Sequence, residues 1–434
     1  MNVAVIGFGV EGQSALHYWR DLGATVTICD INDAVTLPAN TPSQLGSEHY
    51  LDNLQHFDLI VRSAGIHPDV ITEKNPGVED KITTVINEFV RVSPTRNIIG
   101  ITGTKGKGTT STLTTRMLEA AGYRVFLGGN IGKSPFDFLP ELTPDDWVVL
   151  ELSSHQLHDF KENIPLAVCL MMAGEHFLWH KSGDNYYNAK RNLFLHQTER
   201  DTAIYFADNE LSHSIAGDSP GKKIPYYASP GAYVEDRKIR IDNEIICDVS
   251  DIKLLGVHNW QNVCAAATIT WQIAQVPDAI RNVATTFTGL PHRLEFVLEH
   301  NNIRYYNDSF ASAPPSSVAA AEAIPGKKVI ILGGFDRELP LEEMAAGLKE
   351  HSDGIRHLVL IGASATRLAA ELDAAGIQNY QVSDARTMEE IVTVARSFAQ
   401  KGDAVVLSPG FPSFDMFKNF EERGLLFKKV VNTL

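Results

Sequence analysis

Short apolar runs recur along the chain and alternate with segments that have helical periodicity. Each run has the length of a strand, and runs that are apolar at consecutive positions are typical of strands buried on both faces. The pattern therefore predicts an α/β fold with parallel sheets covered by helices. The runs are VAVIG, TVTICD, DLIVRSAG, NIIGITG, WVVLELSS, LAVCLMM, KVIILGG, HLVLIGA and AVVLSPG.

Two stretches with proline and glycine interrupt this periodicity. The first is RVSPTRN, around Pro94, and the second is FTGLPHRLE, around Gly289 and Pro291. Proline and glycine at such points favour joints between domains. We therefore predict three α/β domains, at residues 1–93, 94–290 and 291–434.

The segment from Ser212 to Asp251 differs from its surroundings because it is polar, rich in turn residues and short in its apolar runs. Such a segment is typical of short strands joined by turns. We expect it to form an antiparallel addition to the middle domain.

Composition and charge narrow the class of protein. The 434 residues are 44% apolar and 21% charged, which is ordinary for globular proteins. A net charge of -15 argues against wrapping nucleic acid or lying on an anionic membrane, because both recruit basic surfaces. No apolar run reaches the roughly 18 residues of a spanning helix, and Met1 leads straight into a strand instead of a basic leader. We expect a cytoplasmic protein that binds neither nucleic acid nor membrane.

The cysteines are widely separated in apolar contexts, and none forms a CxxC pair. Metal or redox sites usually need closely spaced cysteines. We therefore expect buried, reduced thiols at Cys29, Cys169, Cys247 and Cys264.

The stretch VIGFGVEG, residues 5–12, has the glycine spacing of a dinucleotide-binding turn. Gly7, Gly9 and Gly12 permit a tight turn and close approach to a pyrophosphate, and Asp30 ends the next strand, where a carboxylate suits ribose hydroxyls. The turn is compatible with an NAD-dependent dehydrogenase and with a Rossmann-like domain for another diphosphate. A second nucleotide loop downstream argues against the dehydrogenase.

That second loop is GITGTKGKGTTSTL, residues 100–113. It follows an apolar strand and opens a helix, so its backbone amides would cradle phosphates and Lys107 would neutralise their charge. Ile101 occupies the usual first glycine position, and Gly108 stands where a hydroxyl normally serves magnesium. Thr109 is our candidate for that hydroxyl. The expected phosphate contacts are Gly103, Thr104, Lys105, Gly106, Lys107, Gly108, Thr109 and Thr110.

A series of ordered motifs resembles those of the Mur ligases. They are TGTKGK, GGNIG, ELSSHQL, YNAKRNLF, GVHNWQN, FTGLPHRLE, NDSFAS and SPGFPSFDMFKNFEERG, and they extend over essentially the whole chain. The resemblance implies a Rossmann-like N-terminal domain for a UDP-sugar substrate, a P-loop central domain for ATP and a Rossmann-like C-terminal domain for an amino acid. Within the family, the members that add D-glutamate to UDP-N-acetylmuramoyl-L-alanine match best.

The resemblance implies an ATP-dependent amide ligase of cytoplasmic peptidoglycan precursor synthesis, acting as a monomer with ATP and Mg²⁺. A carboxylate oxygen is a poor leaving group, so the family first phosphorylates the substrate carboxylate to an acyl phosphate, which the incoming amine attacks. The implied catalytic residues are Lys107, His176, Lys190 and Arg293. The implied metal ligands are Thr109, Glu151, His176 and Lys190, with Lys190 carbamylated.

Further contacts follow from the same resemblance. The implied contacts of the UDP substrate are Val10, Glu11, Asp30, Ile31, Asn32, Gly65, Asn130 and Gln156. The implied nucleotide contacts beyond the loop are Asn259, Asn262, Arg293 and Asp308. The two asparagines are three residues apart where a helix begins, so both can offer an amide on one face.

The family's amino-acid clamp maps onto Ser312, Arg337, Ser413 and Phe420. Phe310 and Arg337 both stand where the family usually has lysine. Arg337 keeps the charge and adds a fork suited to a carboxylate, whereas Phe310 loses a charge. D-glutamate is the expected amino acid. L-glutamate, a ligase like the folylpolyglutamate synthetases, which share the GKGT loop, and the less favoured NAD-dependent oxidoreductase remain alternatives.

Overall fold

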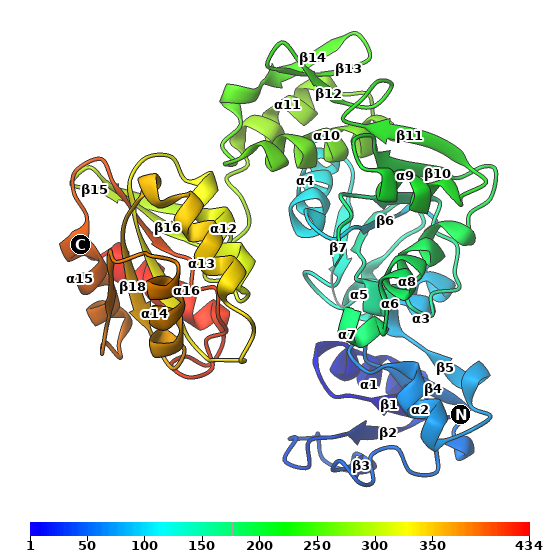
Figure 1. Cartoon of the computed structure of the whole chain (residues 1–434). Helices are drawn as coiled ribbons and strands as arrows, with labels where there is room; N and C mark the ends of the chain where they lie inside the picture. The colour runs from blue at the N-terminus through cyan, green and yellow to red at the C-terminus, as the bar shows by residue number, and fades with distance from the viewer. Residues whose placement is uncertain (175–176) are drawn as a thin grey trace. The chain divides into compact units, whose positions relative to one another are not determined.

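The computed structural model describes residues 1–174 and 177–434. The chain divides into two compact units, and Figure 1 follows it through both. Unit 1 comprises Met1–Asp251 and His258–Thr285, and unit 2 comprises Ile252–Val257 and Thr286–Leu434. The prediction of an α/β fold with parallel sheets is confirmed, as the following paragraphs describe.

The first sheet of unit 1 is parallel, with strand order β3-β2-β1-β4-β5. Along β1, Val3 and Val5 pack on the face covered by α1, while Ala4 and Ile6 pack on the opposite face. A strand covered on both faces explains its uninterrupted apolar run. The elements are β1 (Asn2–Ile6), α1 (Val10–Asp21), β2 (Thr25–Asp30), β3 (Ser43–Leu45), β4 (Leu59–Arg62), α2 (Pro68–Lys74), β5 (Ile82–Thr83) and α3 (Val85–Val92).

The second sheet of unit 1 is also parallel, with order β11-β10-β9-β6-β8-β7. Its strands are β6 (Ile98–Thr102), β7 (Val125–Gly129), β8 (Trp147–Glu151), β9 (Leu166–Cys169), β10 (Thr202–Phe206) and β11 (Lys222–Tyr226). Its helices are α4 (Lys107–Ala120), α5 (Pro135–Phe138), α6 (Ser154–Leu157), α7 (Phe177–His180), α8 (Gly183–Leu195), α9 (Glu210–Gly217), α10 (Val257–Trp271) and α11 (Pro277–Thr286). Strand β6 is central, so the loop that follows it opens at the middle of the sheet edge.

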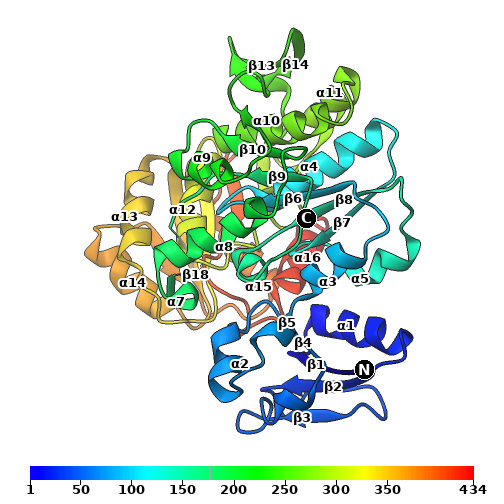
Figure 2. The same ribbon diagram turned by 90° about the vertical axis from the view of Figure 1, so that its right-hand side faces the viewer.

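The expected antiparallel addition is confirmed for β12 (Tyr233–Glu235), β13 (Lys238–Ile241) and β14 (Glu244–Asp248), which form a small sheet of their own. In Figure 2, β13 and β14 stand at the end of unit 1 away from the first sheet. The expectation was wrong for the preceding residues, because α9 crosses to β11, which pairs parallel with β10. Helical crossovers of this kind join parallel strands.

The two sheets of unit 1 share one hydrophobic core. Residues of α1, such as Trp19, and residues of the second sheet, such as Leu150, belong to the same buried cluster. The Tyr18 ring stacks on Phe136 with centroids 4.0 Å apart. This common core explains why both sheets belong to a single compact unit.

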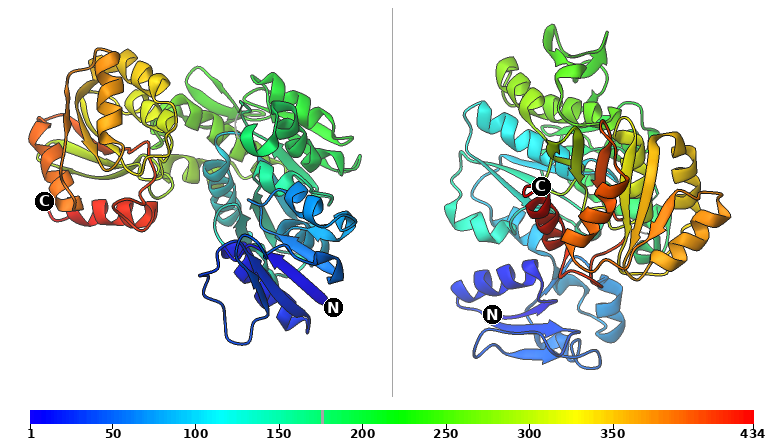
Figure 3. Two further views of the ribbon diagram at one scale, coloured as in Figure 1. Left: turned by 60° about the horizontal axis from the view of Figure 1, so that its bottom comes forward. Right: turned by 90° about the vertical axis from the view of Figure 1, so that its left-hand side faces the viewer.

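Unit 2 is built on a sheet of order β15-β16-β20-β17-β18-β19, parallel except for β15, which runs antiparallel to β16. Val329 and Ile331 pack on the face of α15 and α16, whereas Ile330 and Leu332 pack on the face of α12, α13 and α14. Figure 3 shows helices on both faces of this sheet. The strands are β15 (Glu295–His300), β16 (Ile303–Asn307), β17 (Lys328–Gly333), β18 (Ile355–Ile361), β19 (Tyr380–Val382) and β20 (Ala404–Leu407). The helices are α12 (Pro314–Ala323), α13 (Glu342–Glu350), α14 (Ala365–Ala374), α15 (Met388–Phe398) and α16 (Phe420–Val431).

The cysteine prediction is confirmed, because all four thiols are free and buried. Burial raises the pKa of Cys29 to about 12 and that of Cys169 to about 11, so neither is a ready nucleophile. Among the helices in the described part of the chain, none combines the length and apolar composition that crossing a bilayer requires.

Candidate active site

The loop between β6 and α4 has the backbone of a phosphate cradle. Gly103 and Gly106 have φ values of +147° and +86°, where a side chain would be strained. A Cβ on Gly103 would also lie 2.7 Å from the Leu170 Cβ, so these positions require glycine. Because α4 begins at Lys107, its first amides point into the loop, where they can bind an anion.

Two lysines direct their ammonium groups at this loop. Lys107 Nζ donates to the carbonyl oxygens of Gly103 and Thr104, at 2.9 and 3.0 Å. Lys190, on α8, donates to the same Gly103 oxygen at 3.0 Å and to Thr102 Oγ1 at 3.2 Å, and only 1% of it is exposed. Two cations thus share one carbonyl oxygen beside a loop that has the shape for phosphate.

A cavity of about 240 Å³ opens beside these lysines. It brings together Lys107, Asn130 and Lys190, which the sequence assigned to different ligands. It also includes residues that the sequence analysis missed, which are Ser153, Ser154, His155 and Tyr186. A signal for Tyr186 was present, since it precedes Lys190 by four residues and therefore shares its face of α8.

Glu151, a predicted magnesium ligand, lies at the end of a strand next to β6. It ends β8 and pairs with Ile101 of β6, one residue before the strand passes into the loop. Its carboxylate is buried, and Oε1 accepts a hydrogen bond of 2.8 Å from Asn130 Nδ2. Thr109 lies half-buried in the first turn of α4. Carboxylate and hydroxyl oxygens are the ligands that Mg²⁺ prefers, so these residues fit that ion.

The predicted ligand His176 lies outside the described residues. Within residues 1–174 and 177–434, no three His, Cys, Asp or Glu side chains gather as a metal cluster. Magnesium at phosphate sites takes much of its coordination from water and phosphate, so a few protein ligands suffice.

Asn259 and Asn262 lie together at the start of α10, next to the phosphate loop. Asn262 Nδ2 donates to Asn259 Oδ1 at 2.9 Å, and Thr110 Oγ1 donates to Asn262 Oδ1 at 3.4 Å. A Cβ on Gly106 would collide with Asn262 Oδ1. The amides therefore contact the loop and each other, and the adenine contact stays a prediction.

The first glycine turn is held by a strand-end carboxylate. Asp30 accepts from Phe8 N at 2.6 Å and from Asn32 N at 2.8 Å. Asp30 thus shapes the turn itself, in addition to its predicted role in ribose binding. Val10 and Ile31 are 69% and 61% exposed, so both apolar side chains face solvent, where a ligand could cover them.

Glu11 and Gln156 join the two sheets of unit 1. Gln156 Nε2 donates to Glu11 Oε1 at 2.7 Å, although the residues are far apart in the sequence. Next to this pair, the Gly65 carbonyl accepts from Trp179 Nε1 at 2.9 Å. The structure therefore gathers Glu11, Gln156 and Gly65 at the junction of the sheets, as expected if they contact one substrate.

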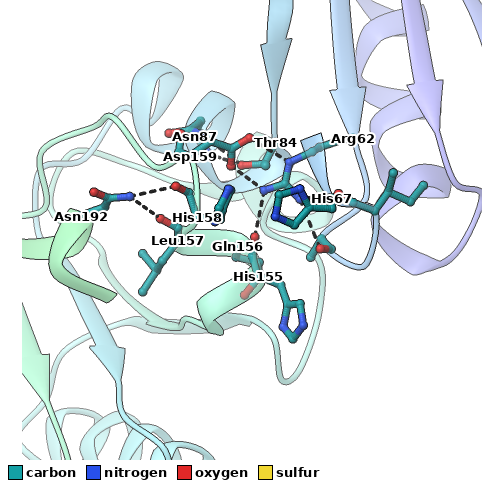
Figure 4. A network of polar contacts seen from close by, with 12 residues as sticks. Arg62, His67, Thr84, Asn87, His155, Gln156, Leu157, His158, Asp159 and Asn192 are labelled. Carbon is teal, nitrogen blue, oxygen red and sulfur yellow. Dashed lines mark hydrogen bonds and ion pairs between the residues drawn. The ribbon is translucent and has the colours of Figure 1, made fainter. Parts of the chain in front are cut away.

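Arg62 is a junction residue that sequence analysis missed. Its fully buried guanidinium donates to both carboxylate oxygens of Asp159, at 2.8 and 2.5 Å (Figure 4). It also donates to the His155 carbonyl at 2.9 Å, and His155 lines the cavity. A charged residue at the end of the apolar run LIVR was the available signal.

In unit 2, Arg293 and Asp308 occupy neighbouring loops. Leu294 N donates to Asp308 Oδ1 at 3.1 Å, and Ser408 Oγ donates to Asp308 Oδ2 at 2.7 Å. Burial raises the pKa of Asp308 to about 7, despite these hydrogen bonds and the positive charge of Arg293. The Arg293 guanidinium lies over the Phe310 ring, 3.8 Å from its centre.

The predicted amino-acid clamp comes from loops at one edge of this sheet. Ser312 follows β16, Arg337 follows β17 and Ser413 follows β20, while Phe420 begins α16. Arg337 is exposed. The Ser413 hydroxyl is buried and lacks a hydrogen-bond partner among the described residues, which a polar ligand would supply. Carboxyl ends of parallel strands are the usual ligand edge of such sheets.

Family models match most of the chain. The model of the Mur ligase middle domain matches residues 101–270, and that of the Mur ligase, glutamate ligase domain matches residues 292–411. A UDP-N-acetylmuramoylalanine--D-glutamate ligase of Clostridium tetani is 35% identical over 100% of this chain and 97% of its own length. The enzyme of that name from Acetivibrio thermocellus is 37% identical over 100% of this chain and 96% of its own length.

Solved structures agree on the fold. The MurF ligase of Thermotoga maritima in complex with ADP has a TM-score of 0.62 and 16% identity, over 99% of this chain and 95% of that one. The UDP-N-acetylmuramate-alanine ligase MurC of the same organism has a TM-score of 0.60 and 15% identity, over 100% and 99%. Two relatives match over the full length at more than 30% identity, and two domain models of the family match as well. The chain therefore belongs to the Mur ligase family.

Proposed function

We propose that the protein is an ATP-dependent ligase that adds D-glutamate to UDP-N-acetylmuramoyl-L-alanine during peptidoglycan precursor synthesis. The observation that carries the chemistry is the cavity where Lys107 and Lys190 meet the phosphate loop. Full-length similarity to ligases of this name supports the choice of substrates.

The proposed reaction has two steps. A carboxylate oxygen of the UDP substrate bonds to the γ-phosphorus of ATP, and the bond from that phosphorus to ADP breaks. The amino nitrogen then attacks the acyl carbon, phosphate leaves with its carboxylate oxygen, and the nitrogen loses a proton. Both steps bring anions together, so Lys107 stabilises the transferred phosphoryl group by neutralising its charge. Arg293 and Asp308, in unit 2, stay predicted contacts of the nucleotide.

We further propose Thr109, Glu151, His176 and a carbamylated Lys190 as ligands of Mg²⁺. When bound, magnesium would neutralise phosphate charge and polarise the phosphoryl oxygens. Carbamylation adds CO₂ to the Lys190 nitrogen; the ammonium loses two protons in all, so a cation becomes a carbamate anion. Activity should then fall when bicarbonate is removed and recover when it is restored. An unmodified Lys190, measured by intact-protein and peptide mass in a fully active enzyme, would contradict this.

For the UDP substrate we propose the residues at the junction in unit 1 together with the first glycine turn. Asn130 hydrogen-bonds to the proposed metal ligand Glu151, which supports its proposed place at the muramoyl end. Glu11, Gln156 and Gly65 would bind between that end and the uridine diphosphate at Val10, Asp30, Ile31 and Asn32. We propose domains at residues 1–93, 94–290 and 291–434, a monomer, and a location in the cytoplasm, where ATP is supplied.

The amino acid is proposed to bind Ser312, Arg337, Ser413 and Phe420. The unpartnered Ser413 hydroxyl supports a polar ligand at this edge. Phe310 stands where the resemblance to the family leads us to expect a lysine, and this missing charge favours a different amino acid as the second candidate. L-glutamate is the first alternative to test.

The decisive experiment measures phosphate release with UDP-N-acetylmuramoyl-L-alanine, ATP and Mg²⁺, with each of a panel of amino acids in turn. We expect release to require both the UDP substrate and an amino acid, and D-glutamate to give the highest kcat/KM. Product mass confirms the amide. Preference for L-glutamate would overturn the choice of amino acid and leave the ligase reaction intact. A separate fluorescence titration with NADH should show no binding, and tight binding would favour the oxidoreductase instead.

A further inference from the structure

Phe310 stands on the loop after β16, and its ring is 41% exposed. The loop belongs to the predicted nucleotide and amino-acid edge of unit 2. The Arg293 guanidinium lies over one face of this ring, 3.8 Å from its centre. That distance is well inside the range of about 6 Å in which a cation is attracted to an aromatic face.

The backbone on both sides of Arg293 is fixed to the same loop. Phe310 N donates to the His292 carbonyl oxygen at 3.0 Å, and Leu294 N donates to Asp308 Oδ1 at 3.1 Å. His292 and Leu294 adopt positive φ values of 63° and 44°, which turn the chain sharply around Arg293. Arg293 therefore projects from a clamped turn.

A second ring supports the Phe310 ring. Phe420, at the start of α16, meets Phe310 edge to face with centroids 5.1 Å apart. Ser309 Oγ donates to the Phe420 carbonyl at 2.8 Å, so the neighbouring backbone is fixed to the same helix end. The Phe310 ring under Arg293 is thus fixed against the start of α16.

We propose that Phe310 is a positioning residue, whose ring holds the Arg293 guanidinium flat so that its N–H edge is presented to a nucleotide phosphate. A stacked guanidinium keeps its donors in one plane, pointing outward, which suits bidentate binding to phosphate oxygens. Phe310 stands where the family resemblance implies a lysine, and its ring contacts the other cation, Arg293. The inference rests on the proposed function, because it assumes that Arg293 contacts the nucleotide.

A double-mutant cycle on nucleotide affinity tests this. The probe is the non-hydrolysable β,γ-imido analogue of ATP with Mg²⁺, titrated by calorimetry against the full chain. Phe310→Leu keeps the bulk and removes the π face, and we expect it to weaken binding about fivefold, as the usual strength of such contacts predicts. Phe310→Tyr should bind like the unmodified protein, because the aromatic face is retained. In an Arg293→Ala background, Phe310→Leu should cause no further loss.

The matched control is Phe296→Leu. Phe296 is 50% exposed on β15 of the same sheet and contacts the Tyr306 ring. It should leave affinity unchanged, and thermal midpoints should show that all variants are folded. Independent, multiplicative losses from Phe310→Leu and Arg293→Ala, or unchanged affinity in Phe310→Leu, would overturn the positioning role while the ligase proposal stands. Failure of the unmodified protein to bind the analogue would overturn the ligase proposal, and this inference with it.

Discussion

The two units hold their candidate charges in different ways. In unit 1, Lys107 and Lys190 donate to carbonyl oxygens of the loop that they serve, and Lys190 is almost fully buried. In unit 2, Arg293 and Arg337 are exposed, and the Arg293 guanidinium lies over the Phe310 ring. If the loop of unit 1 binds phosphate as we propose, its lysines are preorganised by hydrogen bonds to the loop itself, whereas Arg293 of unit 2 is positioned by packing on an aromatic ring.

The largest loss of stability should come from breaking the Arg62–Asp159 ion pair at the junction of the two sheets in unit 1. Arg62→Ala removes a fully buried guanidinium and leaves the largely buried Asp159 carboxylate without its ion-pair partner. Loss of one partner of a buried pair typically costs about 3 to 5 kcal/mol. We expect the free energy of unfolding of unit 1, measured with urea, to fall by this amount.

Arg191→Ala is the matched control, because Arg191 pairs with Asp218 and both side chains are partly exposed. Exposed pairs are worth about 0 to 1 kcal/mol. Similar losses of unfolding free energy in the two variants would show that the Arg62 pair contributes no more than a surface pair. The buried junction would then not be what holds the site of unit 1 in place.

Removing the loop cation should have the largest effect on chemistry. Lys107→Ala deletes the ammonium that donates to the Gly103 and Thr104 carbonyl oxygens. The negative charge that develops on the transferred phosphoryl group is then no longer neutralised by this cation. Loss of one fixed charge or donor commonly costs about 100- to 1,000-fold in rate. We expect phosphate release to fall at least about 100-fold, with little change in the thermal midpoint. Lys161→Ala, at an exposed position of the same unit, should keep full activity. Substantial phosphate release by the Lys107 variant would contradict preorganisation in unit 1.

In unit 2 a smaller, selective effect is expected at Arg337. Arg337→Ala should raise the KM for D-glutamate about 30-fold, which corresponds to about 2 kcal/mol for an unpaired substrate carboxylate, while the KM for ATP changes little. Arg337→Lys should recover part of the loss, because a point charge replaces a fork. Arg386→Ala removes another exposed arginine of unit 2 and serves as the control. An unchanged KM for D-glutamate would remove Arg337 from the clamp.

The contrast also explains what the sequence could predict. Apolar runs such as VAVIG predicted the buried strands because a strand covered on both faces needs apolar residues at every position. The phosphate loop was predictable because Gly103, Gly106 and Lys107 are local requirements of one turn. These features depend on neighbours in sequence, which a pattern records.

Features that depend on distant residues were missed. Arg62 meets Asp159 97 positions along the chain, and the Phe310 ring meets Arg293 only because a clamped turn brings the two loops together. Likewise, β11 was misassigned because its pairing with β10 is set by the crossover through α9 and not by its own polar sequence. Long-range pairing of this kind leaves little local signal.

Unit 2 also holds a buried carboxyl, Asp308, near the exposed Arg293 and the buried Arg423, and it predicts a pH effect on stability. Burial raises the pKa of Asp308 to about 7 from an ordinary value of 3.8. The folded state therefore holds the Asp308 proton more tightly than the unfolded state. Between about pH 4 and pH 7, the free energy of unfolding should fall as pH rises, by at most about 1.4 kcal/mol per pH unit. This contribution is complete below that window and is lost above it.

Asp308→Asn keeps the shape of the side chain and removes the titration, so it isolates the contribution of this carboxyl. The difference in free energy of unfolding between the unmodified protein and Asp308→Asn, measured with urea from pH 4 to pH 8, should decline through the window and level off above it. Asp353→Asn, which alters an exposed carboxylate of the same unit, should reproduce the unmodified pH profile. A flat difference for Asp308→Asn across the whole range would mean that the carboxyl titrates normally. The loops that clamp Arg293 would then be open to water at Asp308.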